Sequence, residues 1–194
     1  MDHGNSLNLQ PSTMNYELST AMDLRYPIGK YEPAPFSTEL KVERLADLKF
    51  LPGLLERAIE NLDEAQLNTP YREDGWTVQQ VVHHVCDSHM NALSRLKFTL
   101  TEDNPTVMGY DENLWAQTIE YNDLPVNISL TMIHALHAKI VSLFSHLTDE
   151  EWKRTYIHSQ SMKQFDLWFL CGLYAWHGKH HVAHITSLRE RNAW

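Results

Sequence analysis

The clearest helix signal in this chain is the stretch Thr77-Val78-Gln79-Gln80-Val81-Val82-His83-His84-Val85-Cys86-Asp87. It opens with a capping box, in which the Thr77 hydroxyl and the Gln80 side chain satisfy backbone donors reciprocally at the start of a helix. Apolar residues then recur at helical spacing as far as Leu96. We therefore predict a long helix from about Val78 to about Leu100, with polar stripes that include His84.

Three further segments have helical periodicity. Ser37 is placed as the N-cap of an amphipathic helix that runs to about Leu62 and is interrupted or kinked near Pro52. Apolar residues repeat at three and four from Leu130 to Leu147, and a last helix is expected over about 166–191. A second capping box, at 148–151, should open a short helical piece. Four helices of about 20 residues, with no strand signal, predict an all-α four-helix bundle.

Two irregular segments complete the chain. Residues 102–125 should form a long loop between the second and third helices, with a turn or two of helix near Trp115, and long loops often cover a site. Prolines punctuate the segment 26–35, so it should run as an extended strap. We divide the chain into a flexible N-terminal arm, residues 1–25, and a bundle domain, residues 26–194.

Composition narrows the function classes. A chain of 194 residues with 43% hydrophobic residues is typical of one globular domain. Its formal net charge of -9 disfavours nucleic acid and anionic membranes as partners, which favours a small-molecule substrate. We expect neither a secretory leader nor a membrane helix, the latter because no segment approaches roughly 20 apolar residues. Cys86 and Cys171 lie in apolar segments and are expected to be reduced core thiols of a cytoplasmic protein.

Histidines are concentrated in the last helix, in the segment His177-Gly178-Lys179-His180-His181-Val182-Ala183-His184. Residues four apart project from one helix face, so both His177 with His181 and His180 with His184 can form a pair. Spacing alone leaves the choice between them open. Either pair, joined by a histidine from another helix, would give a metal three neutral imidazoles and leave one coordination position free.

The chain resembles the YfiT branch of the DinB-like four-helix proteins. The resemblance runs in order from about residue 26 to residue 188, and it is carried by the strings 26–30 (YPIGK), 76–91 (WTVQQVVHHVCDSHMN), 100–105 (LTEDNP) and 174–185 (YAWHGKHHVAHI). In that family one ligand precedes a hydrophobic-x-Asp step, and two others form an H-x-x-x-H pair. The resemblance thus implies His84, His177 and His181 as metal ligands, one Zn²⁺ or Ni²⁺ per subunit, and a homodimer.

The resemblance also implies metal-dependent hydrolysis of a small molecule. A water acidified by the ion would attack an ester, an amide or a similar electrophile. One alternative is an S-transferase, since relatives in the superfamily conjugate low-molecular-weight thiols such as bacillithiol to electrophiles. A second alternative is a non-catalytic metal-binding stress protein. The residue that would act as general base is not identified by the sequence.

Several residues around the histidines are candidates for supporting roles. Asp87, close to His84 in sequence, is a candidate acceptor for a ligand N–H. The substrate-binding candidates lie on the polar stripe of the second helix and in the long loop: Ser88, Asn91, Arg95, Tyr110 and Trp115. Among the other histidines, His89 is expected to hydrogen-bond in the core or touch substrate. We expect His83 and His180 to be surface or packing neighbours, and four histidines to be solvated: His134, His137, His146 and His158.

Overall fold

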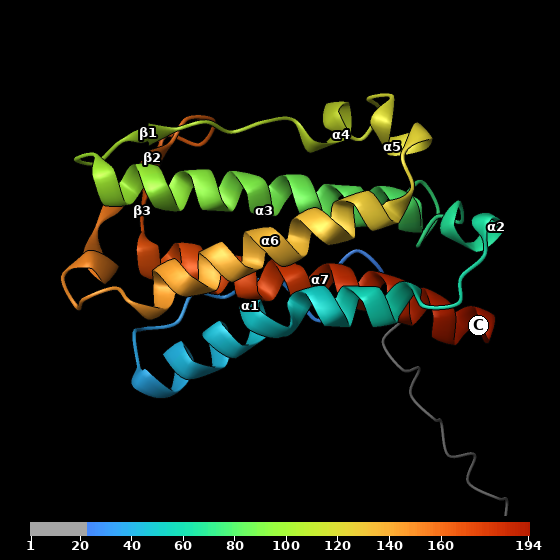
Figure 1. The fold of residues 1–194 in the computed structure, drawn as a ribbon, viewed down its shortest axis with the longest axis horizontal. Helices are drawn as coiled ribbons and strands as arrows, with labels where there is room; N and C mark the ends of the chain where they lie inside the picture. Colours follow the sequence, from blue (N-terminus) through green and yellow to red (C-terminus); the bar gives the residue numbers. More distant parts are fainter. Residues whose placement is uncertain (1–22) are drawn as a thin grey trace, which may run out of the picture.

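The computed structural model describes residues 23–194, so the expected N-terminal arm lies outside the described residues as far as residue 22. Four long helices form the body of the molecule: α1 (Thr38–Ile59), α3 (Val78–Thr101), α6 (Val126–Ser145) and α7 (Leu167–Asn192) (Figure 1). The predicted all-α four-helix bundle is confirmed.

Side-chain caps start the helices where the sequence predicts them. The Ser37 hydroxyl accepts a hydrogen bond from the Leu40 N–H at 3.1 Å, and α1 then continues through Pro52 without interruption. At the start of α3, the Thr77 hydroxyl accepts from the Gln80 N–H at 3.1 Å, while the Gln80 side chain accepts from the Thr77 N–H at 3.0 Å. Both helix starts are thus fixed by local hydrogen bonds.

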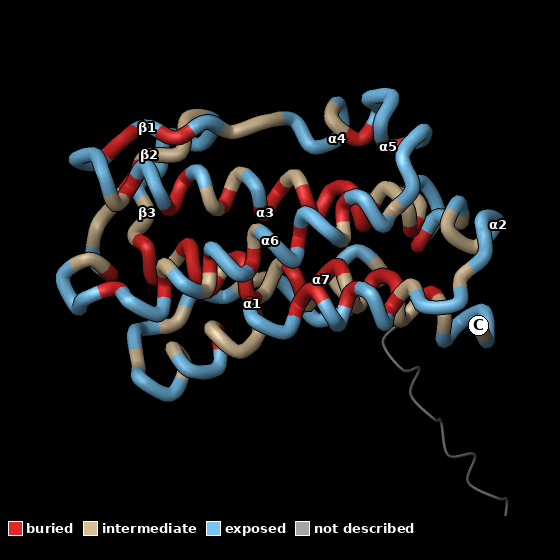
Figure 2. The backbone as a smooth tube through the Cα atoms, in the orientation of Figure 1, coloured by how far each residue is buried: buried red, intermediate tan, exposed pale blue. Residues whose placement is uncertain are grey.

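The order of the helices around the bundle differs from their order along the chain. Helix α1 packs against α6 and α7, and α3 packs against the same two helices. The consecutive long helices α1 and α3 therefore lie on one diagonal of the bundle, and α6 and α7 lie on the other. Buried residues line the facing sides of α3 and α7 (Figure 2). This arrangement brings the two histidine-rich helices side by side, although α6 separates them in sequence.

A small sheet corrects the expectation of no strands. Strands β1 (Thr106–Val107), β2 (Thr155–His158) and β3 (Lys163–Asp166) form a three-stranded sheet, with β1 parallel to β2 and β2 antiparallel to β3. Strands this short give too few alternating positions for a pattern to be recognised. The hairpin turn also uses a residue other than glycine in the left-handed region, Met162 with φ 54°. The sheet anchors the start of the long loop near one end of α3.

The long loop contains two short helices, α4 (Glu112–Trp115) and α5 (Glu120–Asp123), as expected of a turn or two of helix. Side chains from the start of α3 hold this loop down. Gln79 donates to the carbonyl of Tyr121 at 2.9 Å, and Gln80 donates to the carbonyl of Ala116 at 3.0 Å.

Two other short helical pieces lie outside the long loop. The predicted capping box at 148–151 forms and opens the 3-10 turn η1 (Glu151–Lys153), whereas α2 (Glu64–Leu67) was not predicted.

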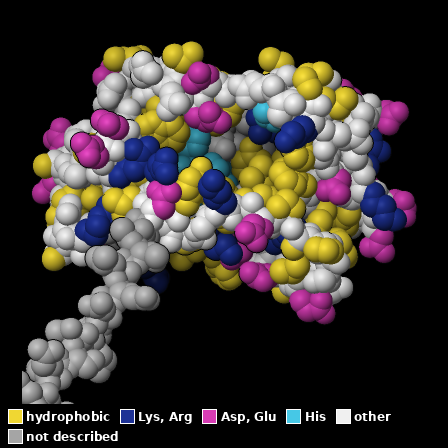
Figure 3. Space-filling view, turned by 180° about the vertical axis from the view of Figure 1, so that it is seen from behind, with side chains coloured by type: hydrophobic (Ala, Val, Ile, Leu, Met, Phe, Trp, Pro, Cys, Tyr) yellow, Lys and Arg dark blue, Asp and Glu magenta, His cyan; other side chains and the backbone are white. Residues whose placement is uncertain are grey.

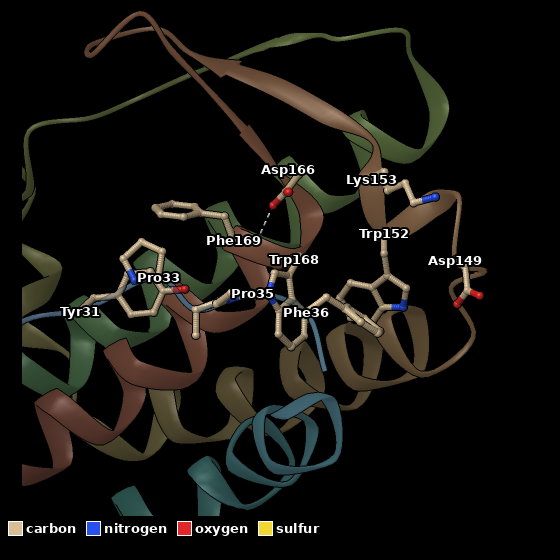
Figure 4. A pocket seen from close by; sticks show the side chains of 11 residues that line it. Tyr31, Pro33, Pro35, Phe36, Asp149, Trp152, Lys153, Asp166, Trp168 and Phe169 are labelled. Atoms are coloured by element: carbon tan, nitrogen blue, oxygen red, sulfur yellow. Dashed lines mark hydrogen bonds between the residues drawn. The ribbon is translucent and has the colours of Figure 1, made fainter. Parts of the chain in front are cut away.

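The proline-rich strap, predicted over residues 26–35, begins with a turn in which the Gly29 N–H donates to the Tyr26 carbonyl at 2.9 Å, which corrects the expectation of an extended path for its first residues. From residue 30 to residue 35 the strap has no helix, strand or turn. With Trp152 and Trp168 it lines a cavity of about 630 Å³, in which aromatic and proline side chains predominate (Figure 4). The Trp168 indole donates to the carbonyl of Ala34 at 2.8 Å. Asp166 caps α7 here, with its carboxylate accepting from the Phe169 N–H at 2.7 Å. This cavity contains no histidine, so it is separate from the site described below.

Helix α6 is long and apolar enough to span a membrane by length and composition, with a hydropathy of 1.3 over its most apolar window. The expectation that no segment comes close to this limit was therefore wrong. Core helices of bundles meet the same criterion, and Ile133, Ile140 and Phe144 of α6 are buried among the other helices.

Candidate metal centre

Three imidazoles converge between α3 and α7. His84 comes from α3, and His177 and His181 come from successive turns of α7. One ring nitrogen of each lies within 4.8 Å of those of the other two, and the Nε2 atoms of His84 and His177 are 3.2 Å apart. A tetrahedral ion bound at about 2.0–2.1 Å places its ligand nitrogens roughly 3.3 Å apart, so this donor set fits a metal. The structure thus brings together the pair His177 and His181, and not the pair His180 and His184.

A glycine lets α7 approach α1 closely behind this cluster. A Cβ atom placed on Gly178 would lie 2.4 Å from the Leu51 side chain of α1, well inside contact distance. Because one side of α7 is pressed against α1 here, the neighbouring His177 and His181 can face α3. The absence of a side chain at Gly178 therefore helps to position His177 and His181.

Burial keeps these imidazoles neutral. His84 and His181 are buried and His177 is half-buried. Desolvation, and then the nearby His180 and His184, lower the pKa of His84 to about 4. Burial, and then the neighbouring imidazoles, hold the pKa values of His177 and His181 well below the ordinary value. At neutral pH each ring therefore has a lone pair free to bind a metal.

A chain of histidines behind His177 determines which of its nitrogens carries the proton. The Leu48 carbonyl can only accept, so His137 donates to it from Nδ1 and leaves its own Nε2 bare. The bare Nε2 accepts from Nδ1 of His89 at 2.9 Å. Nε2 of His89 must then accept from Nδ1 of His177, at 3.2 Å. We call this chain of hydrogen-bonded histidines a relay. Its last ring is His177, whose Nε2 is therefore unprotonated and faces the cluster.

A second relay acts on His181 in the same way. The Arg25 carbonyl accepts from Nε2 of His184 at 3.2 Å, which leaves Nδ1 of that ring bare. This Nδ1 accepts from Nδ1 of His181 at 3.3 Å, so Nε2 of His181 keeps its lone pair. Residue 25, included in the expected flexible arm, thus lies against the bundle. In both relays a backbone carbonyl sets the tautomer of a candidate ligand, a function that outer hydrogen bonds commonly serve in metal sites.

Two expectations about these partners were wrong. Asp87 accepts a hydrogen bond from the Tyr121 hydroxyl at 2.7 Å and makes no hydrogen bond to a candidate ligand. Its side chain lies on a neighbouring stripe of α3, and histidines take the supporting role instead. His137, expected to be solvated, is 2% exposed. Its position between Ile133 and Ile140 on the apolar stripe of α6 is the sequence signal that could have placed it in the core.

Among the remaining histidines outside the relays, His134 and His146 are exposed, as expected. The other three described ones have packing roles or line the site. His83 is buried and hydrogen-bonds Ser129 at 2.7 Å, and His180 stacks on Trp176 with ring centroids 4.5 Å apart. Both fit the expectation of packing neighbours. His158, expected to be solvated, is half-buried and lines the cavity described next. The free thiols of Cys86 and Cys171 are buried as expected, and burial raises their pKa values to about 11 and about 12.

A cavity of about 520 Å³ opens onto the three rings. Figure 3 shows the hollow, with histidine side chains (cyan) on its floor and basic side chains beside it. Three of the predicted substrate-binding residues line it: Ser88, Arg95 and Tyr110. The other two do not, because Asn91 bonds the Asp87 carbonyl and Trp115 packs against Tyr110 with centroids 4.3 Å apart. The acidic residue Glu112 of the long loop also lines the cavity.

Comparison with known proteins matches this architecture to a family. The model of the DinB superfamily matches residues 47–185. A protein of Bacillus mycoides (strain KBAB4), named "Putative metal-dependent hydrolase", is 48% identical over 89% of this chain and 99% of its own length. A Bacillus cereus (strain B4264) protein of the same name is 47% identical over the same shares of the two chains.

A solved structure agrees with both the fold and the family. YfiT from Bacillus subtilis, described as "a probable metal-dependent hydrolase with an unusual four-helix bundle topology", superposes with a TM-score of 0.86 at 41% identity. The match covers 88% of this chain and 98% of that chain. From its bundle, its sequence relatives and its structural neighbour, the chain belongs to the DinB superfamily and is similar to YfiT.

Proposed function

We propose that this protein is a metal-dependent hydrolase of a small molecule, with one Zn²⁺ or Ni²⁺ held by His84, His177 and His181. The convergence of three neutral imidazoles at the floor of a cavity is the observation that carries the proposal. Neutral imidazole nitrogens suit both ions. Among residues 23–194 no fourth His, Cys, Asp or Glu donor joins this group, which leaves room for water or substrate.

The bound ion would supply Lewis acidity for hydrolysis. The chain's own residues position and shield the reacting groups. The two relays orient His177 and His181, and the Trp76 ring covers His84 with centroids 4.5 Å apart, which excludes water from that side. The Ser88 hydroxyl lies 3.5 Å from Nε2 of His177, close enough to hydrogen-bond a substrate atom held at the ion.

Reconstitution with each metal tests this proposal. The zinc-loaded and nickel-loaded proteins should hydrolyse a panel of simple esters and amides without added thiol, and the metal-free protein should not. Activity that appears only when a low-molecular-weight thiol is supplied would contradict hydrolysis and indicate the S-transferase. Full metal binding with no turnover under either condition would indicate a non-catalytic metal-binding protein.

Two substitutions on α7 provide a matched pair. His177→Ala should abolish both stoichiometric metal and hydrolysis, whereas His180→Ala should leave the metal content nearly intact. Both side chains lie on the same helix near the cavity, and only His177 belongs to the ring cluster. Elemental analysis of the purified variants measures the difference. A full complement of metal in the His177 variant would refute the ligand assignment.

We also propose that the protein is a homodimer in the cytoplasm. Exposed apolar side chains on the adjacent helices α1 and α6 support an interface there: Phe50 (60% exposed), Leu54 (40%), Ile128 (44%) and Met132 (43%). Such side chains mark association surfaces when they gather. Light scattering on the purified protein should give twice the chain mass, and Phe50→Glu should reduce it to that of one chain; a monomeric wild type would refute the dimer.

A further inference from the structure

The cavity contains a buried arginine that is incompletely satisfied. Arg95 on α3 is 9% exposed and lines the same cavity as the three histidines. Its Nη1 donates to the Tyr174 hydroxyl at 2.9 Å, and its Nη2 donates to the Met108 carbonyl at 2.9 Å. The Nε–H is buried without a hydrogen-bond partner. A guanidinium has five N–H donors, so donors of Arg95 remain free to bind a ligand.

No acidic side chain neutralises this charge. Within residues 23–194, no carboxylate lies within 4.0 Å of the Arg95 guanidinium, and both of its hydrogen-bond partners are neutral. Glu112 lines the cavity but is exposed and makes no ion pair with it. Removing an uncompensated charge from water costs free energy, so buried cations are normally paired with an anion. An anionic ligand would supply the missing partner of Arg95.

A second buried arginine of this chain shows the contrast. Arg44 is also largely buried, but its guanidinium lies over the Trp168 ring, with Cζ 3.7 Å from the centroid. It also donates to the Trp168 carbonyl at 3.1 Å. Aromatic stacking satisfies the faces of this cation, and the Cζ of Arg95 lies over no aromatic ring among the described residues. The two arginines therefore have different roles, structural for Arg44 and unassigned for Arg95.

Arg95 is placed to bind one end of a molecule whose other end lies at the metal. Ser88 and Arg95 lie on the same polar stripe of α3, separated by a helical rise of about 10 Å. Tyr174, the hydrogen-bond partner of Arg95, precedes His177 by one turn of α7. The Tyr110 hydroxyl, which is buried without a hydrogen-bond partner, lines the same cavity. The cavity thus has a metal-binding end and a donor-rich cationic end.

We propose that Arg95, assisted by Tyr110, is a subsite for an oxyanion, so that the substrate carries a carboxylate or a phosphonate-like group apart from the bond that reacts at the metal. This inference rests on the proposed function only in placing the reacting bond of the substrate at the metal. The free guanidinium N–H and the Tyr110 O–H would donate to the anion, while Tyr174 and the Met108 carbonyl hold the guanidinium in place. Such charge-assisted hydrogen bonds select strongly for a charged over a neutral group.

Hydroxamates with a second functional group test the subsite. A hydroxamate binds the metal, and a linker of two to five methylene groups carries a carboxylate, a phosphonate or a neutral primary amide at its other end. Isothermal titration of the zinc-loaded protein should show, for at least one linker, that an acid binds at least tenfold more tightly than its amide. Comparing the two acids distinguishes a carboxylate from a phosphonate as the preferred group.

Substitutions of Arg95 test whether this residue causes the preference for the acid over the amide. In Arg95→Gln the acid and the amide should bind within about threefold of each other, while the amide keeps its wild-type affinity. Arg95→Lys should keep part of the preference, since it keeps the charge, and the control Arg44→Gln should keep all of it. Equal binding of acid and amide by the wild type at every linker length would overturn the subsite. A preference that survives in Arg95→Gln would do the same.

A measurement without metal separates this inference from the proposed function. If no hydroxamate binds the zinc-loaded protein, the open metal site is wrong, and the subsite is then judged on the metal-free protein. There, adipate should raise the melting temperature of the wild type more than adipamide does, and Arg95→Gln should remove the difference. The absence of any difference in the wild type would overturn the subsite on its own.

Discussion

Acid should destabilise the metal-free protein well above the pH at which carboxylates titrate. Burial lowers the pKa of four histidines from the ordinary 6.5 to about 4: His84, His137, His180 and His184. Between these two values the unfolded chain binds protons that the folded chain does not. The free energy of unfolding is therefore highest above pH 6.5 and falls as the pH drops toward 4.

The expected loss is large. For one imidazole whose pKa changes from 6.5 to about 4 on folding, the free energy of unfolding falls by about 2 kcal/mol between pH 7 and pH 5. Four such groups act in the same direction, and burial also lowers the pKa values of His89, His177 and His181. The combined loss in free energy of unfolding from these buried histidines is comparable to the whole stability of a typical domain, about 5–15 kcal/mol. The metal-free protein should therefore unfold as the pH is lowered, before it reaches pH 4.

Urea denaturation of chelator-treated protein at pH 7, 6 and 5, followed by circular dichroism at constant ionic strength, measures this slope. Saturating zinc should raise stability at each pH, because the ion binds only the folded site with high affinity. A free energy of unfolding that stays constant from pH 7 to pH 5 would refute the argument, since it would mean that the buried rings are already protonated or are accessible to protons in the folded state.

Further predictions concern the relays, the metal and the helix cap. His89→Leu removes the acceptor for Nδ1 of His177 and should weaken zinc binding about 10–100-fold, as measured by competition with a chromogenic chelator. His89→Gln keeps an acceptor and should recover part of the loss. Equal affinities in both variants would exclude the tautomer role. His184→Leu should weaken binding by a similar factor through His181, and its combination with His89→Leu should lower affinity further than either change alone. Chelator treatment should lower the melting temperature at pH 7, and an unchanged melting temperature would mean that the native state gains nothing from the ion. Thr77→Ala should cost about 1 kcal/mol of stability in urea without changing the denaturant slope, and a neutral effect would show that the capping box is not used in solution.

Local signals in the sequence were sufficient to predict the four long helices. The cap at Ser37 and the capping box at Thr77 lie where the structure has them, because they depend on residues within one turn. The sheet could not be predicted in this way. Strand β1 pairs with β2 across about 50 positions, as in Thr106 with Ile157, and the register of that pair depends on where the bundle places the two segments.

The candidate ligands were accessible to the sequence for a different reason. Helical spacing gave two possible pairs on α7, and the family resemblance favoured His177 with His181, whose rings the structure brings to His84. The relays were not accessible, because they join α3 to α6 and α7 to the segment before α1. Only the packing of the whole bundle determines which buried ring lies behind which ligand.

X-ray absorption spectroscopy of the zinc-loaded protein tests the central claim most directly. The account predicts three imidazole nitrogens at about 2.0–2.1 Å with one or two further oxygen ligands, and the loss of one imidazole in His84→Ala. A sulfur scatterer at about 2.3 Å, or a fourth protein nitrogen that closes the site, would contradict an open three-histidine centre.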